Sequence, residues 1–188
     1  MTSQTRNVPE LVTERLIIRA LTVRDHSVRR VGYLGRHAPN RPYDKGPPTA
    51  GGLGIEDFHA LVARFAGWAA TDETYVFGLF LRSDSAMAGI FDLSTYVRDE
   101  RDWANIGYVV HNQFQGQGLA AEALRAVLTA AHSNLDFQRV EAAVRPNNSA
   151  AVATALASGM ECEGIRKRFW LDPDGWADHA IYASVRGL

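Results

Sequence analysis

The stretch GYVVHNQFQGQGLAAE, residues 107–122, predicts how this chain folds. It joins an apolar run that ends at Val110 to a short loop with two glycines, and this loop leads into the strongest helical pattern of the chain. In that pattern apolar residues recur at the spacing of one helix face, at positions Ala120, Leu124, Val127, Leu128 and Ala131. The stretch therefore predicts a buried strand that enters a long helix through a glycine loop.

The loop around Gly116 and Gly118 has the physical properties of an anion site. The first amide N–H groups of a helix have no intrahelical partner, and the helix dipole adds about half a positive charge there. Because glycine has no Cβ, a phosphate can approach the backbone closely. No Gly-Lys-Ser/Thr follows Gly118, and no third glycine completes a dinucleotide fingerprint. We expect a pyrophosphate site here, with a tight turn that binds nothing as the alternative.

On both sides of the glycine loop, the sequence patterns predict strands and helices. Residues 35–54, between the first two predicted helices, contain five glycines and four prolines among 20 residues, which predicts a long loop. We expect strands at 16–19, 75–81, 86–93, 103–110, 139–145, 165–171 and 180–185, and helices at 23–31, 58–69, 119–132 and 149–158. The order is that of an α/β protein.

Composition limits the possible classes of function. The 188 residues fit one domain, and 20 Lys and Arg against 21 Asp and Glu leave no basic excess for nucleic acid. No apolar run is long enough for a membrane span, and residues 1–10 are polar, so we expect a flexible start without a secretory signal. The single cysteine, Cys162, excludes an internal disulfide and a multi-cysteine metal site. A soluble, cytoplasmic protein that binds neither nucleic acid nor membrane is expected.

The pattern Gln115-x-x-Gly118-x-Ala120 resembles the Arg/Gln-x-x-Gly-x-Gly/Ala motif of the GNAT acetyltransferase superfamily, in which this loop binds the pyrophosphate of coenzyme A. Residues 13–19 resemble the opening strand of the RimJ/RimL-type branch, which includes the ribosomal-protein N-terminal acetyltransferases. The resemblance extends over about residues 11–186 and implies one GNAT domain over residues 1–188. The implied α/β (α+β) fold has a central mixed, mostly antiparallel twisted sheet flanked by helices, with its fourth and fifth strands splayed apart.

The resemblance also implies the donor, acetyl-CoA, and the residues that hold it, with no metal. In the family the backbone of the fourth strand pairs with the pantetheine arm, and an Asn at the position of Asn148 hydrogen-bonds the cofactor; a helix cap is the alternative role for Asn148. The implied cofactor-binding residues are Tyr108, Val109, Val110, Gln115, Gly116, Gln117, Gly118, Leu119, Ala120 and Asn148.

The implied reaction is direct attack of an amine on the thioester, which requires removal of a proton from the amine. Our first candidate for the catalytic base is Glu141, on the polar side of the 139–145 strand; the alternative is an ion pair with Arg139 or Arg145. His111, at the end of the central strand, is a weaker candidate because an imidazole can titrate near neutrality; the favoured alternative is a polar residue at a strand end. Cys162 has no His neighbour in sequence, so we interpret it as a bystander.

Three positions depart from the family pattern and bear on turnover. Asn105 stands where relatives often have Glu, Ala151 where they have Ser, and Ala155 where several have a Tyr that acts as an acid. These departures keep open an alternative function, an acyl-CoA-binding regulatory module without turnover. The acceptor is expected to be a primary amine, either a peptide N-terminus or a small-molecule amine, near the 35–54 loop. A homodimer is left open.

Overall fold

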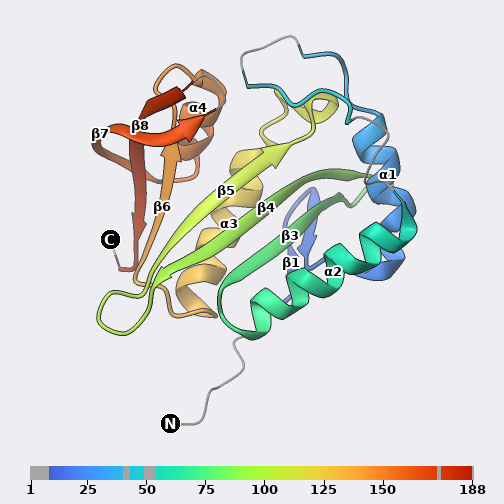
Figure 1. Ribbon diagram of the computed structural model, residues 1–188, viewed down its shortest axis with the longest axis horizontal. Coiled ribbons are helices and arrows are strands. Elements are labelled where there is room, and N and C mark those ends of the chain that lie inside the picture. The colour runs from blue at the N-terminus through green and yellow to red at the C-terminus, as the bar shows by residue number, and fades with distance from the viewer. Residues whose placement is uncertain (1–8, 40–42, 49–53, 173–174, 188) are drawn as a thin grey trace.

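The computed structural model describes residues 9–39, 43–48, 54–172 and 175–187 (Figure 1). Within these ranges, eight strands form one sheet in the order β1-β2-β3-β4-β5-β6-β8-β7. The strands are β1 (Leu11–Val12), β2 (Leu16–Arg19), β3 (Thr74–Leu81), β4 (Met87–Val97), β5 (Trp103–Val110), β6 (Arg139–Val144), β7 (Glu161–Asp172) and β8 (Gly175–Val185). The helices are α1 (His26–Leu34), α2 (Ile55–Ala70), α3 (Leu119–Ser133) and α4 (Ser149–Ala157), with 3-10 turns η1 (Val23–Asp25) and η2 (Asn112–Phe114).

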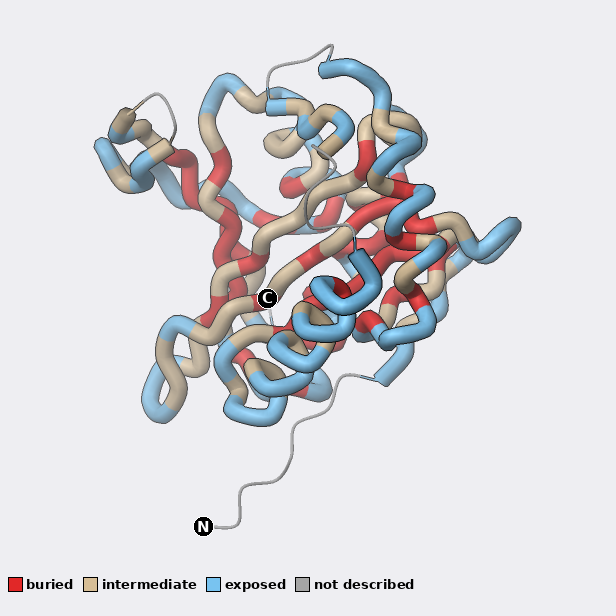
Figure 2. Tube along the Cα trace, turned by 45° about the vertical axis from the view of Figure 1, so that its right-hand side comes forward, coloured by how far each residue is buried: buried red, intermediate tan, exposed pale blue. Residues whose placement is uncertain are grey.

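Helices cover both faces of this sheet (Figure 1). The larger apolar cluster joins the strands to α3 and includes Leu124, Val127 and Leu128, so the predicted stripe faces the sheet. A smaller cluster on the other face joins α1 and α2 to β3 and β4 around Phe58 and Phe80. Buried residues therefore gather along the strands, while the helices carry exposed residues on their outer sides (Figure 2).

The pairing of β5 with β6 differs from every other strand pairing described in the sheet. It is parallel and covers three register pairs, the last of them Asn105 with Glu141, whereas the other pairs of neighbouring strands are antiparallel. β5 continues along β4 to Val110, and β6 continues along β8 to Val144. The two strands therefore separate toward their C-terminal ends. Since β1 was not among the predicted strands, β5 and β6 are the fourth and fifth strands of the prediction, and the predicted mixed sheet with these two strands splayed apart is confirmed.

The predicted elements are present, with different ends. The strand predicted at 86–93 reaches Val97 because residues 94–97 keep pairing with β5, although none of them is buried. The last two strands are longer than predicted because they form a hairpin in which β7 pairs with β8 alone. The two-residue strand β1 was not predicted. The described part of the 35–54 loop, residues 35–39 and 43–48, contains no helix or strand beyond α1, as predicted; residues 40–42 and 49–53 lie outside the description, as do residues 1–8 of the expected flexible start.

Candidate functional site

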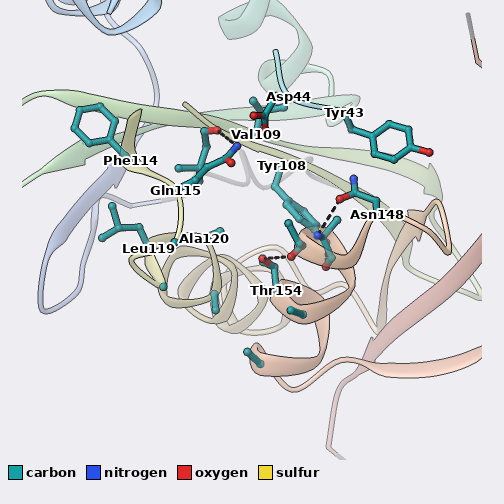
Figure 3. Close-up of a pocket in the computed structure, with 18 of the residues that line it drawn as sticks. Tyr43, Asp44, Tyr108, Val109, Phe114, Gln115, Leu119, Ala120, Asn148 and Thr154 are labelled. Atoms are coloured by element: carbon teal, nitrogen blue, oxygen red, sulfur yellow. Dashed lines mark hydrogen bonds between the residues drawn. The ribbon is translucent and has the colours of Figure 1, made fainter. Parts of the chain in front are cut away.

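A cavity of about 580 Å³ opens where β5 and β6 separate, between the end of β5, the glycine loop, the start of α3 and helix α4 (Figure 3). Nine of the ten residues predicted to bind the cofactor line it: Tyr108, Val109, Val110, Gln115, Gly116, Gly118, Leu119, Ala120 and Asn148. The residues that sequence reasoning missed are Tyr43, Asp44, Lys45, Phe114, Ala121, Ala150, Ala151, Ala153, Thr154 and Ala157. The structure thus brings the predicted loop, strand and helix cap together around one space.

The glycine loop presents the free end of α3 to this cavity. Gly116 and Gly118 both have φ +77°, a left-handed conformation that favours glycine, and Gly118 is the N-cap of α3. The backbone N–H of Glu122 donates to the Gly118 carbonyl at 3.1 Å, so the amides of residues 119–121 have no intrahelical acceptor. A Cβ added to Gly118 would meet only the Arg15 guanidinium, at 3.6 Å. In the protein without a ligand, glycine is therefore required at this position by its backbone conformation and not by crowding from neighbouring atoms.

A carboxylate holds this helix end against the first strands. The Glu122 carboxylate accepts hydrogen bonds from the Thr13 hydroxyl at 2.5 Å, the Arg15 backbone N–H at 2.8 Å and the Arg15 Nε at 2.7 Å. Arg15 also donates through Nη1 to the carbonyl of Gln117 at 2.7 Å. Burial acts to raise the pKa of Glu122, but the bonds from Thr13 and Arg15 outweigh it and hold this pKa below its usual value. The turn before β2 therefore fixes the position of the glycine loop.

The end of β5 forms the strand side of the cavity. Tyr108 lines the cavity and its hydroxyl donates to the Ala151 carbonyl at 3.0 Å, while burial raises the pKa of this phenol. The Gln115 side chain turns back and donates to the Val110 carbonyl at 3.3 Å. The carbonyl of the last β5 residue is thus held by the loop that follows it, and this bond links the strand to the glycine loop.

Helix α4 forms the opposite side. The Asn148 side chain accepts from the Ala151 backbone N–H at 3.2 Å, so the helix-cap role is confirmed, and Asn148 also lines the cavity. Small residues of α4, such as Ala150 and Ala153, leave the space open. Their signal in the sequence, an Ala-rich helix, is equally typical of a packed helix, and so it did not mark a site.

The 35–54 loop reaches the same cavity, which was not expected. Tyr43, Asp44 and Lys45 line it, and the Tyr43 hydroxyl donates to the Asn147 side-chain oxygen at 2.6 Å. The loop was predicted to border the acceptor site. In the structure its described part lies at the cavity that the cofactor residues form.

Two predicted site residues lie outside the cavity lining. Gln117 is exposed and contributes its carbonyl to Arg15. Glu141 is only 4% exposed, and its carboxylate pairs with the Arg139 guanidinium at 2.7 Å and the Arg166 guanidinium at 3.1 Å. The alternative role as an ion-pair partner is thus confirmed for Arg139; Arg145 instead pairs with Asp172 at 2.5 Å. The proposed role of Glu141 as a base stays a prediction.

The two remaining candidate residues, His111 and Cys162, also lie outside the cavity lining. His111 is fully buried, and burial together with the charges of Arg36 and Arg29 lowers its pKa to about 3, well below the near-neutral range considered for a base at this position. Cys162 is an exposed, free thiol on β7 and does not line the cavity.

In the described ranges, no group of three or more His, Cys, Asp or Glu is arranged to hold a metal ion. None of the helices described there has the length and apolarity that a bilayer crossing requires.

Comparison with known proteins identifies the family. Residues 15–161 match the model of the acetyltransferase (GNAT) domain. The chain is 33% identical over 112 residues to the probable N-acetyltransferase YjcK of Bacillus subtilis, a match that spans 60% of this chain and 62% of that protein. It is 28% identical over 189 residues to the ribosomal protein uS5-alanine N-acetyltransferase of Escherichia coli, which covers 94% of this chain and 92% of that enzyme.

A solved structure shows the same fold. Mycobacterium smegmatis RimJ in complex with CoA-disulfide superimposes with a TM-score of 0.77 at 23% identity, over 91% of this chain and 82% of that one.

The Glu122 carboxylate gives a first test of the site. We expect Glu122→Ala to lower the free energy of unfolding by roughly 1–3 kcal/mol, because Thr13 and Arg15 lose their shared acceptor. Since the pKa of Glu122 is lowered in the folded state, this stabilisation is present above its unfolded-state pKa and is lost as the pH falls through its folded-state pKa. Urea unfolding at two pH values measures both effects. Glu14→Ala, an exposed neighbour in the same turn, is the control; an equal loss in both variants would contradict the role of Glu122.

Proposed function

The chain belongs to the GNAT acetyltransferase family, and we propose that it acetylates the N-terminal amine of a protein or peptide. As a family member it is an N-acetyltransferase that uses acetyl-CoA as donor and an amine as acceptor. One observation carries the proposal: a single cavity is lined both by the N-terminal end of α3, whose first amides have no intrahelical acceptor, and by the part of β5 that does not pair with β6.

The residues around this cavity fit coenzyme A. The amides that begin α3 and the two left-handed glycines suit the pyrophosphate, since they offer N–H donors and no side chain in the way. The edge of β5 from Tyr108 to Val110 suits the pantetheine arm, because an extended arm can pair with an open strand edge as a further strand would. When bound, the donor supplies an acetyl thioester, an acyl group activated toward an amine. No metal is part of this proposal.

An N-terminal amine is the favoured acceptor for two reasons. The relative from Escherichia coli that aligns over most of the chain is named as an alanine N-acetyltransferase of a ribosomal protein. An α-amine has a pKa of about 7.7–8, so roughly one in six to one in eleven is neutral at pH 7, whereas a lysine amine is almost wholly protonated. An α-amine therefore loses its proton to a base in the site more easily than a lysine amine does. Ribosomal proteins are made in the cytoplasm, and we place the enzyme there; the free Cys162 thiol fits such a reducing compartment.

The acceptor can be tested by release of the coenzyme A thiol. We expect release with peptides that carry a free N-terminus and none with the same peptides blocked at the N-terminus, even where they contain lysine. Small amines form the third arm. Preference for a small amine would overturn the N-terminal assignment. Tight binding of acetyl-CoA without release in any arm would favour the alternative of a regulatory module.

The glycine loop can be tested by substitution. We expect Gly118→Val to weaken acetyl-CoA binding more than tenfold, or by about 1.4 kcal/mol or more, because a branched side chain at φ +77° would both strain the loop and fill the anion site. Calorimetry measures the affinity, and circular dichroism should show the helices retained. Gly159→Val is the matched control, since Gly159 also has a positive φ, +91°, but does not line the cavity. Unchanged binding in the Gly118 variant would contradict the assignment.

Glu141→Gln separates the two roles considered for Glu141. Because this buried carboxylate holds Arg139 and Arg166, we expect the variant to melt at a lower temperature while its rate per folded molecule stays near that of the wild type. A melting curve and a pH–rate profile measure both. A base would instead show a loss of about 10²–10⁴ in rate with partial recovery at high pH and unchanged acetyl-CoA binding.

A further inference from the structure

The face of β4 and β5 that lies opposite α3 is only partly covered. On the α3 side Phe91, Leu93 and Ala104 are fully buried, as the core requires. The residues that alternate with them point to the other face and are half-buried: Asp92 and Ser94 on β4, and Asn105, Gly107 and Val109 on β5. We call these five residues the open face. It lies beside the separation of β5 and β6, on the side where an acceptor can approach without crossing α3 (Figure 1).

Asp92 is the only carboxylate of the open face, and it lies over Gly107. The two residues are register partners across β4 and β5. A Cβ on Gly107 would stand 2.6 Å from Asp92 Oδ1 and 2.9 Å from Oδ2, so a larger residue would displace the carboxylate. Glycine here makes room for Asp92. Val109, at the cavity, is two residues further along β5 on the same face, a rise of about 7 Å.

The Asp92 carboxylate has no hydrogen-bond or ion-pair partner within the part of the chain that the structure describes. Glu141, in contrast, is held by two guanidinium groups. Burial alone raises the pKa of Asp92. Tyr96 of β4 responds to the charge of Asp92: burial raises the pKa of Tyr96, the charges of Glu141 on β6 and of Asp92 raise it further, and Arg166 on β7 lowers it. An unpartnered carboxylate in a half-buried site is costly and is characteristic of a functional group.

We propose that Asp92 is the general base of the reaction and takes a proton from the ammonium group of the acceptor, directly or through one water. This inference rests on the proposed function. The acceptor nitrogen gives one proton to Asp92, and its freed electron pair forms the C–N bond to the acetyl carbon while the C–S bond breaks. The second proton of the nitrogen goes to the sulfur, which leaves as a thiol, and Asp92 then releases its proton to water. Protons and charges balance, and no further reactant is needed.

The proposed role of Asp92 as a base and its unpartnered charge predict opposite effects of one substitution: a loss of activity and a gain of stability. Asp92→Asn keeps the shape and removes the base, so we expect kcat to fall by about 10²–10⁴ and the acidic limb of the pH–rate profile to disappear. The same change removes an unpartnered charge. Because the pKa of Asp92 is raised in the folded state, its ionised form costs stability as the pH rises through that pKa, and the variant should melt at a higher temperature at pH 7. Acetyl-CoA affinity, measured by calorimetry, should not change.

Glu100→Gln, which removes one exposed carboxylate from the turn between β4 and β5, is the matched control and should leave rate, profile and melting temperature near those of the wild type. Carbon-13 NMR of the Asp92 carboxyl gives a readout that does not depend on activity, and it should titrate above the usual range for Asp. An Asp92→Asn variant as active per folded molecule as Glu100→Gln, or one that melts lower, overturns the proposal. If the wild type acetylates no amine, the proposed function fails, and a carboxyl that titrates in the ordinary range then overturns the inference about Asp92 by itself.

Discussion

The short parallel contact between β5 and β6 is the constraint on which the rest of the structure depends. Parallel strands need a crossover connection, and α3 supplies it between these two strands. Because their pairing ends at Asn105 and Glu141, the edge of β5 beyond that point lacks a neighbouring strand, and buried backbone groups require partners. The crossover helix begins at the same place and turns its free amides toward the gap. One feature of topology thus creates both the open strand edge and the anion site.

The two carboxylates near this gap show how burial and pairing divide the roles. Glu141 is almost fully buried and neutralised by Arg139 and Arg166, so it joins β6 to β7 as a structural ion pair. Asp92 is less buried, no described residue pairs with its carboxylate, and glycine across the register keeps the space beside it open. A chain selected for stability alone would pair or replace Asp92, whereas a site that must accept a proton needs a carboxylate that is not already satisfied.

The sequence predicted most of the fold because its patterns are local. The α3 stripe and the glycine loop each lie within one element, and the structure has both. In β6 the predicted apolar positions Val140, Ala142 and Val144 are buried, but Glu141, predicted on the polar face, is buried as well. The parts that were missed depend on long-range geometry: no local signal told that Tyr43 reaches the cavity, that Glu122 binds the turn before β2, or that the guanidinium partners of Glu141 come from both β6 and β7. Asp92 did carry a signal, a single charge inside the apolar run 86–93, but its lack of a partner is visible only in three dimensions.

The most direct test of this account is the response of the backbone amides to the donor. In a nitrogen-15 NMR titration with acetyl-CoA, the largest shifts should fall on the amides of residues 116–121 and of Tyr108 and Val110. The glycine loop lines the gap between β5 and β6, and the backbone groups of these two β5 residues face away from β4, whereas those of Val109 and His111 face it. Amides of α2, on the other face of the sheet, should move little. Saturable binding whose largest shifts lie outside the glycine loop and the end of β5 would contradict the claim that the separation of these strands forms the donor site.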